Sequence, residues 1–302
     1  MPDRLSAAIA RHSVGLWSDS AVPHLTLVTL DEPVPSVDLL YLPMVCFTTG
    51  GAKRIVAGDR SWVTGEGEML LNSVVAPVTA TFEQVPYRSV VLRLDGQLLA
   101  DLLLELDAAD PPAGPGSGEQ IGAPITPELL DAVTRWVGLL DTPDDIRPLA
   151  ARIEGEILYR LLGTPLGPAL RRFAVADSGA ARVRAAALWI SEHFAEPLGV
   201  DTIAKVAHMS AATLHRRFKA ATGMSPLRFQ KQLRLQEARR LLVAGNTTAA
   251  LVAEAVGYVS ATQFNREYRR AYGLPPGQDA ARLRRRLADD GRKSVAIRPA
   301  SR

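Results

Sequence analysis

The C-terminal part of the chain repeats itself at an offset of 50 residues. Each copy carries a serine, then apolar, basic and aromatic residues at matching positions, then a glycine and a proline. The matched pairs are Ser210 with Ser260, Leu214 with Phe264, Arg216 with Arg266, Phe218 with Tyr268, Lys219 with Arg269, Gly223 with Gly273, and Pro226 with Pro276. Serine is a favoured helix N-cap, and glycine commonly ends a helix. Each copy therefore predicts a helix-turn-helix unit.

Capping and periodicity signals predict helices throughout this region. The expected helices are 183–194, 202–208 with Asp201 as N-cap, 211–222, 226–244, 249–256, a helix from Ser260 to Gly273, and 280–287. The helix 226–244 has 19 residues, so it spans roughly 28 Å. With a turn at each end, it would set the two recognition helices roughly one DNA turn, about 34 Å, apart.

The distribution of charged residues also separates the C-terminal part of the chain from the rest. Residues 1–179 hold 13 Lys and Arg against 23 Asp and Glu, whereas residues 180–302 hold 22 against 9. A basic half joined to an acidic half favours a polyanionic partner such as double-stranded DNA. The alternative is a helical array whose basic side chains are only solvated.

Residues 180–288 resemble the DNA-binding domain of AraC-type transcriptional regulators. The resemblance rests on Ile203-Ala204, Ser210, Leu214, Arg216, Phe218-Lys219, Gly223 and Ser225-Pro226, on the segment 232–242, and on Val256-Gly257-Tyr258 with the second copy of the repeat. One departure concerns the last helix. The family usually places an aromatic and then a basic residue where this chain has Asp279-Ala280.

The resemblance implies which side chains face DNA. The implied base-reading residues are Ala212, His215, Arg216 and Lys219 in the first unit, and Ala261, Thr262, Asn265 and Arg266 in the second. Arginine suits guanine, asparagine suits adenine, and small methyl groups suit thymine. Four further basic residues, Lys231, Arg234, Arg269 and Arg270, are expected to contact phosphates.

The N-terminal region, 1–110, reads as short strands. The expected strands are 24–30, 39–48, 53–57, 60–64, 68–71, 78–83 and 88–95, with a hairpin turn at Gly58-Asp59. Residues 39–94 resemble the cupin-like barrel of AraC-type regulators. Such a barrel could hold a small organic effector, and the candidate lining residues are Tyr41, Met44, Phe47, Trp62, Leu71 and Phe82. The alternative is that these side chains are simply core.

The middle and the end of the chain complete the expected organisation. Residues 111–127 are rich in Pro and Gly and predict a linker. Two helices in 128–176 carry apolar stripes, 129–140 and 153–162, which would either cover the barrel or join two copies in a homodimer. Residues 289–302 are basic and poor in apolar residues, which predicts a disordered tail.

Several function classes are disfavoured. The five His show no metal-ligand spacing, no nucleophile or nucleotide motif is present, and no cofactor is expected. The longest apolar run has nine residues, 39–47, too short to span a membrane, and the beginning of the chain lacks a signal-peptide core. A single cysteine, Cys46, fits the cytoplasm.

These observations predict an α+β two-domain protein: a cupin-like barrel with two following helices, then an all-α domain with two helix-turn-helix units. The expected function is sequence-specific transcription regulation without enzymatic activity, with RNA polymerase as a further partner. Two rivals remain open: a cupin-type enzyme fused to a DNA-binding domain, and a DNA binder without an effector.

Overall fold

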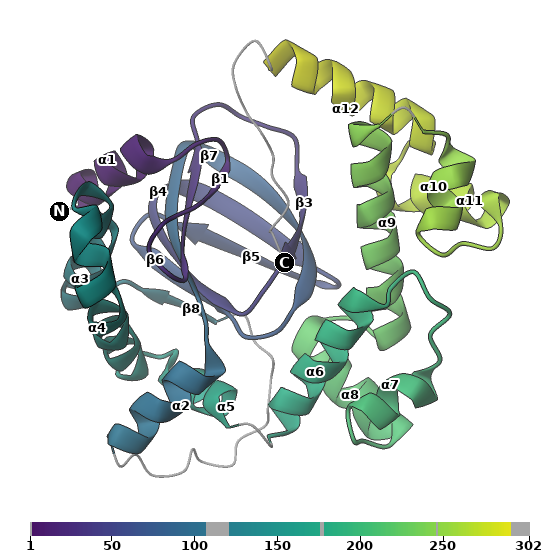
Figure 1. Cartoon of the computed structure of the whole chain (residues 1–302). Helices are drawn as coiled ribbons and strands as arrows, with labels where there is room; N and C mark the ends of the chain where they lie inside the picture. Colours follow the sequence, from purple (N-terminus) through teal and green to yellow (C-terminus); the bar gives the residue numbers. More distant parts are fainter. Residues whose placement is uncertain (1, 107–120, 176–177, 246, 291–302) are drawn as a thin grey trace.

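The computed structural model describes residues 2–106, 121–175, 178–245 and 247–290. Within these residues, an antiparallel sheet with helices against it forms the N-terminal part, and seven further helices form the C-terminal part (Figure 1). The expected α+β architecture with a helical second domain is therefore confirmed.

In the part of the chain that the structure describes, eight strands form one antiparallel sheet. They are β1 (Trp17–Asp19), β2 (Leu25–Leu30), β3 (Val37–Tyr41), β4 (Met44–Ala57), β5 (Arg60–Gly65), β6 (Glu68–Asn72), β7 (Ala76–Arg93) and β8 (Ile121–Pro124). The order is β1-β2-β7-β4-β6-β8, with β3 added to β7 and β5 added to β4. Strands β4 and β7 are long and curved, and each pairs with different neighbours at its two ends.

The strand boundaries predicted within β4 and β7 are wrong. Gly50-Gly51 does not end a strand but lies within β4, where the register with β7 shifts. Gly51 has φ +71, and a Cβ there would lie 2.4 Å from the carbonyl oxygen of Gln84, so the strands approach more closely than another residue would allow. The predicted strand 39–48 is in fact interrupted, because β3 ends at Tyr41 and β4 begins at Met44. The hairpin at Gly58-Asp59 is confirmed.

The sheet curves but does not close into a barrel. Among the described residues, β1 pairs only with β2 and β8 only with β6, so the two edges do not meet. The cupin-like prediction is thus right for the curved antiparallel sheet and wrong for full closure. The two faces carry separate apolar clusters: Val45, Phe47 and Leu71 point to the helix-covered face, and Tyr41, Met44 and Cys46 point to the concave face.

Helices cover the outer face of the sheet (Figure 1). They are α1 (Pro2–His12), α2 (Gly96–Glu105), α3 (Pro127–Gly138), the 3₁₀ turn Leu139–Asp141, α4 (Pro143–Leu162) and α5 (Gly167–Ala174). Leu129, Trp136 and Leu161 are fully buried in one cluster with the sheet residues Phe47 and Leu71. The apolar stripes of α3 and α4 therefore cover their own sheet, which removes them as the predicted contact between two copies.

Helices α1, α2 and α5 and strands β1 and β8 were not predicted. The three helices have 11, 10 and 8 residues, so each is too short for an apolar period to stand out in the sequence. Part of the predicted linker, 121–124, is strand β8 paired with β6, so the linker assignment is wrong there. Its earlier residues, 111–120, lie outside the described part of the chain.

The C-terminal helices are α6 (Gly179–Glu192), α7 (Val200–Val206), α8 (Ala211–Thr222), α9 (Pro226–Ala244), α10 (Ala249–Ala255), α11 (Ala261–Tyr272) and α12 (Pro276–Asp290). Asp201 was expected to cap α7, but the helix starts at Val200, two residues earlier than predicted, and Asp201 lies in its first turn. Helix α12 is longer than predicted and includes residues 289 and 290 of the expected tail. The rest of that tail lies outside the described residues.

Candidate nucleic-acid interface

Each of the two candidate recognition helices begins and ends as its repeat predicts. The Ser210 hydroxyl accepts a hydrogen bond from the Thr213 amide at the start of α8, and Ser260 accepts one from Gln263 at the start of α11. Gly223 and Gly273 end these helices with φ +73 and +77, a left-handed conformation that favours glycine. The caps fix both helices independently of the rest of the fold.

One face of each helix packs inward. Leu214 and Phe218 of α8 are fully buried in one apolar cluster, and Phe264 and Tyr268 of α11 are fully buried in another. The two units therefore have separate cores, and α9 contributes side chains to both. This division matches the internal repeat.

The opposite face of each helix is exposed. All eight implied base-reading residues lie there: Ala212, His215, Arg216 and Lys219 on α8, and Ala261, Thr262, Asn265 and Arg266 on α11. Within the described chain, Arg216 and Arg266 form no hydrogen bond or ion pair, so their guanidinium groups are available to a ligand. The structure thus brings each group of four together on its own helix.

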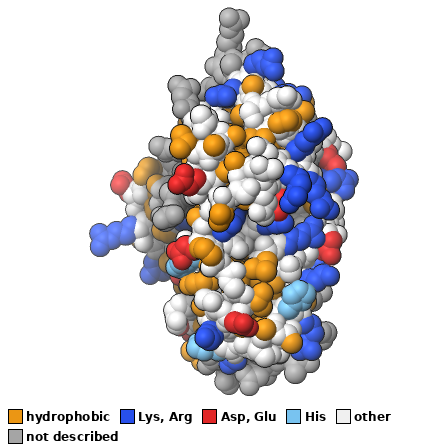
Figure 2. Space-filling model, turned by 90° about the vertical axis from the view of Figure 1, so that its right-hand side faces the viewer, with side chains coloured by type: hydrophobic (Ala, Val, Ile, Leu, Met, Phe, Trp, Pro, Cys, Tyr) orange, Lys and Arg blue, Asp and Glu red, His pale blue; other side chains and the backbone are white. Residues whose placement is uncertain are grey.

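Helix α9 separates the two units along its 19-residue length (Figure 1). Lys and Arg side chains gather along one side of the helical face in Figure 2, from its upper to its lower part. The exposed cations of α8, α9 and α11 are Arg216, Arg217, Lys219, Arg228, Lys231, Arg240, Arg266, Arg269 and Arg270. A basic face extended over two helix-turn-helix units suits the backbone of a duplex.

The four residues that were expected to contact phosphate differ in exposure and in their partners. Arg269 and Arg270 are exposed. Lys231 is half exposed, and its Nζ lies 3.1 Å from Glu267, which ties α9 to α11. Burial alone would raise the pKa of Glu267, but hydrogen bonds from Tyr258, Gln263 and Lys231 lower it below its ordinary value. Lys231 therefore already neutralises an ionised carboxylate.

Arg234 was wrongly assigned to phosphate. Its guanidinium donates to the backbone carbonyls of Phe194 at 2.7 Å, Glu196 at 2.8 Å, Ala195 at 3.3 Å and Gly257 at 2.8 Å. These carbonyls follow α6 and α10, so Arg234 joins the two units internally. Four of its five N–H groups donate within the protein, and a sequence pattern cannot distinguish such an arginine from a free one.

The sheet contacts the first recognition helix at its end. The turn of the β4–β5 hairpin lies so close to the end of α8 that a Cβ on Gly58 would be 2.5 Å from the Gly223 carbonyl oxygen. Arg60 donates to the carbonyl of Ala220 at 2.8 Å. Val74 and Val75 after β6 also lie in the same apolar cluster as Phe218. The sheet therefore contacts both the C-terminal end of α8 and its apolar core.

A second contact joins the sheet to the other unit. Arg239 of α9 lies between Asp38 of β3 and Asp279 of α12, 2.9 Å from each carboxylate. Tyr268 of α11 also donates to Asp279, which is fully buried. This network explains the unusual Asp279 in the last helix, because its carboxylate is the hub that holds α9, α11 and α12 together. No local sequence pattern indicates these roles of Asp38, Arg239 and Asp279, because the contacts join residues far apart in the chain.

The candidate effector residues divide between the two faces of the sheet. Tyr41, Met44, Trp62 and Phe82 belong to the concave cluster. Phe47 and Leu71 point to the other face and pack under the helices, so their assignment to a pocket is wrong. Alternation along β4 explains the error, since Met44 and Cys46 share one face while Val45 and Phe47 share the other.

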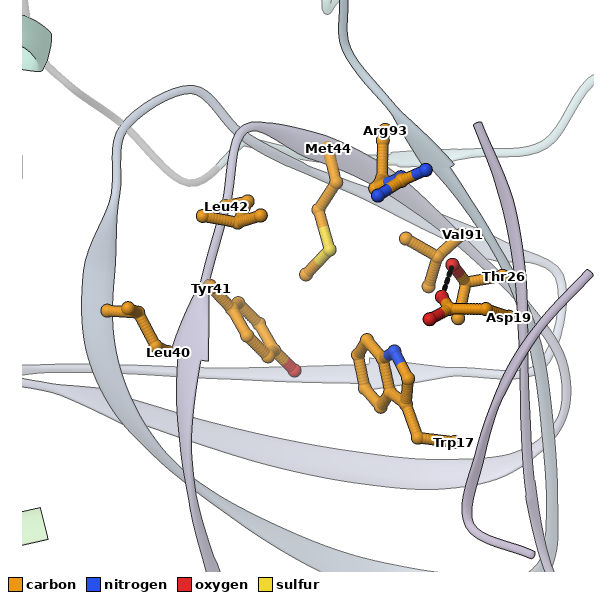
Figure 3. Close-up of a pocket in the computed structure, with 9 residues that line it drawn as sticks. All are labelled: Trp17, Asp19, Thr26, Leu40, Tyr41, Leu42, Met44, Val91 and Arg93. Carbon is orange, nitrogen blue, oxygen red and sulfur yellow. Dashed lines mark hydrogen bonds between the residues drawn. The ribbon is translucent and has the colours of Figure 1, made fainter. Parts of the chain in front are cut away.

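A hollow does open on the concave side. It is lined by Trp17, Asp19, Thr26, Leu40, Tyr41, Leu42, Met44, Val91 and Arg93, and Figure 3 shows these residues. Only Tyr41 and Met44 were among the predicted lining residues. Strand β1, which brings Trp17 and Asp19, is three residues long and gave no sequence signal.

The described residues hold no group of three or more His, Cys, Asp or Glu side chains arranged to bind a metal ion. No helix among them has both the length and the apolar character needed to cross a membrane.

Comparisons with known proteins match both parts of the chain. Residues 21–169 match a family model described as the N-terminus of AraC-type transcriptional regulators, and residues 203–282 match a helix-turn-helix domain. The chain is 30% identical over 164 residues to the HTH-type transcriptional activator RhaS of Salmonella schwarzengrund strain CVM19633. That match covers 52% of this chain and 58% of RhaS, so it spans little more than half of the relative.

Among solved structures, the chain is similar in fold to ToxT of Vibrio cholerae strain SCE256. The apo K231A variant gives a TM-score of 0.54 at 8% identity, covering 87% of this chain and 98% of ToxT. Wild-type ToxT bound to an unsaturated fatty acid gives 0.51 at 10% identity, covering 85% and 94%. At these identities the likeness concerns the fold alone.

Proposed function

We propose that this chain, which belongs to the AraC-type transcriptional regulators, binds DNA sequence-specifically and thereby regulates transcription. The observation that carries the proposal is the pair of capped helices, α8 and α11, with exposed basic and polar faces on two units joined by α9. Each helix would enter one of two successive major-groove segments.

Base reading is assigned to the exposed faces. Arg216 and Arg266 would each bind a guanine, Asn265 an adenine, and the methyl groups of Ala212, Ala261 and Thr262 would lie against thymines. His215 and Lys219 complete the first face. Phosphate contacts are assigned to Arg269 and Arg270, with Lys231 as a further contact that must share its charge with Glu267.

The sheet domain is assigned a regulatory rather than a catalytic role, in the cytoplasm. It contacts both helix-turn-helix units, through Gly58 and Arg60 on one side and through Asp38 on the other. A small organic effector that changes the sheet would therefore change how the units are held. RNA polymerase would be the partner that senses the bound regulator.

A homodimer is also part of this function. Two copies would place four recognition helices on DNA and raise affinity through effective concentration. Because the stripes of α3 and α4 are buried, the contact would use exposed side chains such as Leu149 and Tyr159 on the outer face of α4. Light scattering of the full chain at micromolar concentration tests this, and a monomer both with and without DNA would contradict it.

Selection of genomic fragments bound by the full chain tests the regulatory function. The expected result is a small set of fragments from promoter regions that share one sequence pattern with two half-sites. A population of fragments without a common pattern would contradict sequence-specific regulation.

A further inference from the structure

A buried lysine lies in the concave face of the sheet. Lys53 of β4 is 1% exposed, and no ion pair of its ammonium occurs among the described residues. Its Nζ lies 3.7 Å from Cys46 Sγ, and 5.6 and 5.2 Å from the ring centroids of Tyr41 and Tyr87. Burial raises the pKa of both phenols, so neither supplies a negative charge at neutral pH. The protein thus buries a cation without a carboxylate.

Tyr41 connects this cation to the hollow. Its ring forms part of the hollow's wall, and in Figure 3 its hydroxyl points into the space beside Trp17. That hydroxyl is buried, and within the described part of the chain no hydrogen bond of standard geometry reaches it, although the Lys53 ammonium is close enough to affect its pKa. A buried hydroxyl without a partner is costly and indicates a site that is completed by another group. Tyr41 therefore offers a donor inside the hollow, and its ring also lies beside the Lys53 ammonium, 5.6 Å from the centroid.

The remaining walls are mostly apolar. Trp17, Leu42, Met44 and Val91 surround the space, and Arg93 lies at its mouth with an exposed side chain (Figure 3). Asp19 is also present; its carboxylate accepts a hydrogen bond from Thr26 at 3.0 Å and is exposed, so solvent screens its charge. A ligand suited to this site has a small apolar body and one anionic group. A phosphate or sulfate ion lacks that body.

From these contacts we infer that the hollow binds a small monocarboxylate, whose carboxylate accepts a hydrogen bond from Tyr41 and neutralises Lys53. This inference rests on the proposed regulatory function and names the chemical class of the effector. Arg93 would attract the anion to the mouth, and Trp17 and Met44 would contact its apolar body.

Because the hollow is small, a bound carboxylic acid would have to move part of its wall, which includes β3. With its open mouth included, the hollow measures about 440 Å³, but its enclosed part has room for only about one or two water molecules. A carboxylic acid must therefore displace part of the wall. Tyr41 belongs to β3, which also carries Asp38, the partner of Arg239. Leu42, next to Tyr41, packs against the apolar cluster of the first helix-turn-helix unit.

Calorimetric titration of the full chain tests the inference. The probes are butyrate, octanoate and benzoate, with butyramide, octanamide and benzamide as neutral counterparts and inorganic phosphate as a plain anion. At least one carboxylate should bind, its amide at least about tenfold more weakly because the charge-assisted bond is lost, and phosphate not at all. If none of the three carboxylates binds, or if an amide binds as well as its acid, the inference is wrong.

Two variants locate the site. Lys53→Met keeps the length of the side chain but removes the charge, and it should weaken carboxylate binding at least about tenfold. Its melting temperature without ligand should not fall, because a buried unpaired charge is removed. Arg54→Met is the matched control, since Arg54 is the next residue on β4 but points outward to Glu83. Unchanged carboxylate binding in Lys53→Met, or an equal loss in Arg54→Met, would overturn the assignment.

Failure here is distinguishable from failure of the regulatory function. DNA binding is measured on the full chain without added acid, and it does not require Lys53. Sequence-specific DNA binding with no carboxylate binding would refute only this inference.

Discussion

Arg239 of α9 donates to Asp38 of β3 across the boundary between the sheet and the helices, with Nη1 2.9 Å from Oδ2. The two side chains are only 14% and 9% exposed. Burial alone would lower the pKa of Arg239, but Asp38 and Asp279 raise it above its ordinary range, so the guanidinium stays charged. Asp38 of the sheet is therefore one of the two carboxylates that pair with this buried guanidinium.

Asp38→Asn should weaken the attachment of the sheet to the helices. Arg239 would lose a charged partner while remaining buried, and we expect the full chain to lose about 1–3 kcal/mol of unfolding free energy. Urea denaturation measures this. Asp31→Asn is the control, because Asp31 also pairs with an arginine, Arg88, but is 68% exposed and should contribute little. Equal losses in the two variants would show that the contact does not join the domains.

Arg216→Ala and Arg266→Ala should each reduce specific DNA binding. Both side chains are exposed, lack a partner within the described chain and occupy matching positions of the repeat. Each substitution should cost about 1–3 kcal/mol at the selected site and relax the preference at one or two base pairs. Titrations with the selected site and with single-base variants of it provide the measurement. If specific affinity is unchanged and only non-specific binding falls, these arginines contact phosphates instead.

Arg234→Ala and Arg269→Ala should have opposite effects. Removing Arg234 takes its hydrogen bond from the Ala195 and Gly257 carbonyls, while those of Phe194 and Glu196 keep the Gln230 amide as a donor. Stability should therefore fall by about 1–3 kcal/mol, and the salt dependence of DNA binding should stay the same. Removing Arg269 should leave stability unchanged and reduce the salt slope by about 1. Denaturation and binding at several salt concentrations separate the two. A reduced salt slope in Arg234→Ala would restore its assignment to phosphate.

Glu267 gives the second unit a defined pH response. The pKa of this carboxyl is lowered in the folded state, so its stabilising effect is present above the unfolded pKa of about 4.3 and is lost as the pH falls through the lower folded value. Glu267→Gln should therefore be less stable than the natural chain at pH 6, with the difference shrinking at pH 4 and below. Urea denaturation over this range measures it. A difference independent of pH would contradict ionic pairing with Lys231.

The helical half of the fold was predictable because its signals are local. Ser210, Gly223, Ser260 and Gly273 each act on the helix next to them, and the apolar period of three to four residues places Phe218 and Tyr268 inside. The exposed faces of α8 and α11 follow from the same period. Prediction failed for Arg234, because its carbonyl partners come from distant turns that no local pattern identifies.

The sheet was harder to predict because its strands bend instead of stopping. Gly50-Gly51 looks like a turn, but it is a bulge that lets β4 curve along β7. Residues 44–47 of β4 are apolar at every position, so no polar alternation in the sequence separates Phe47 from Met44, and only their odd separation along the strand places them on opposite faces. The pairing of Asp38 with Arg239 spans 201 residues, and only the folded chain brings the two together.

Hydroxyl-radical footprinting on a selected genomic site tests the central claim, that two helices of one chain read two successive major-groove segments. The natural chain should protect two segments about one helical turn, roughly 10 base pairs, apart on one face of the duplex. Arg216→Ala should weaken protection of one segment and Arg266→Ala that of the other. Protection of a single segment per bound chain, or loss of the same segment in both variants, would contradict the account.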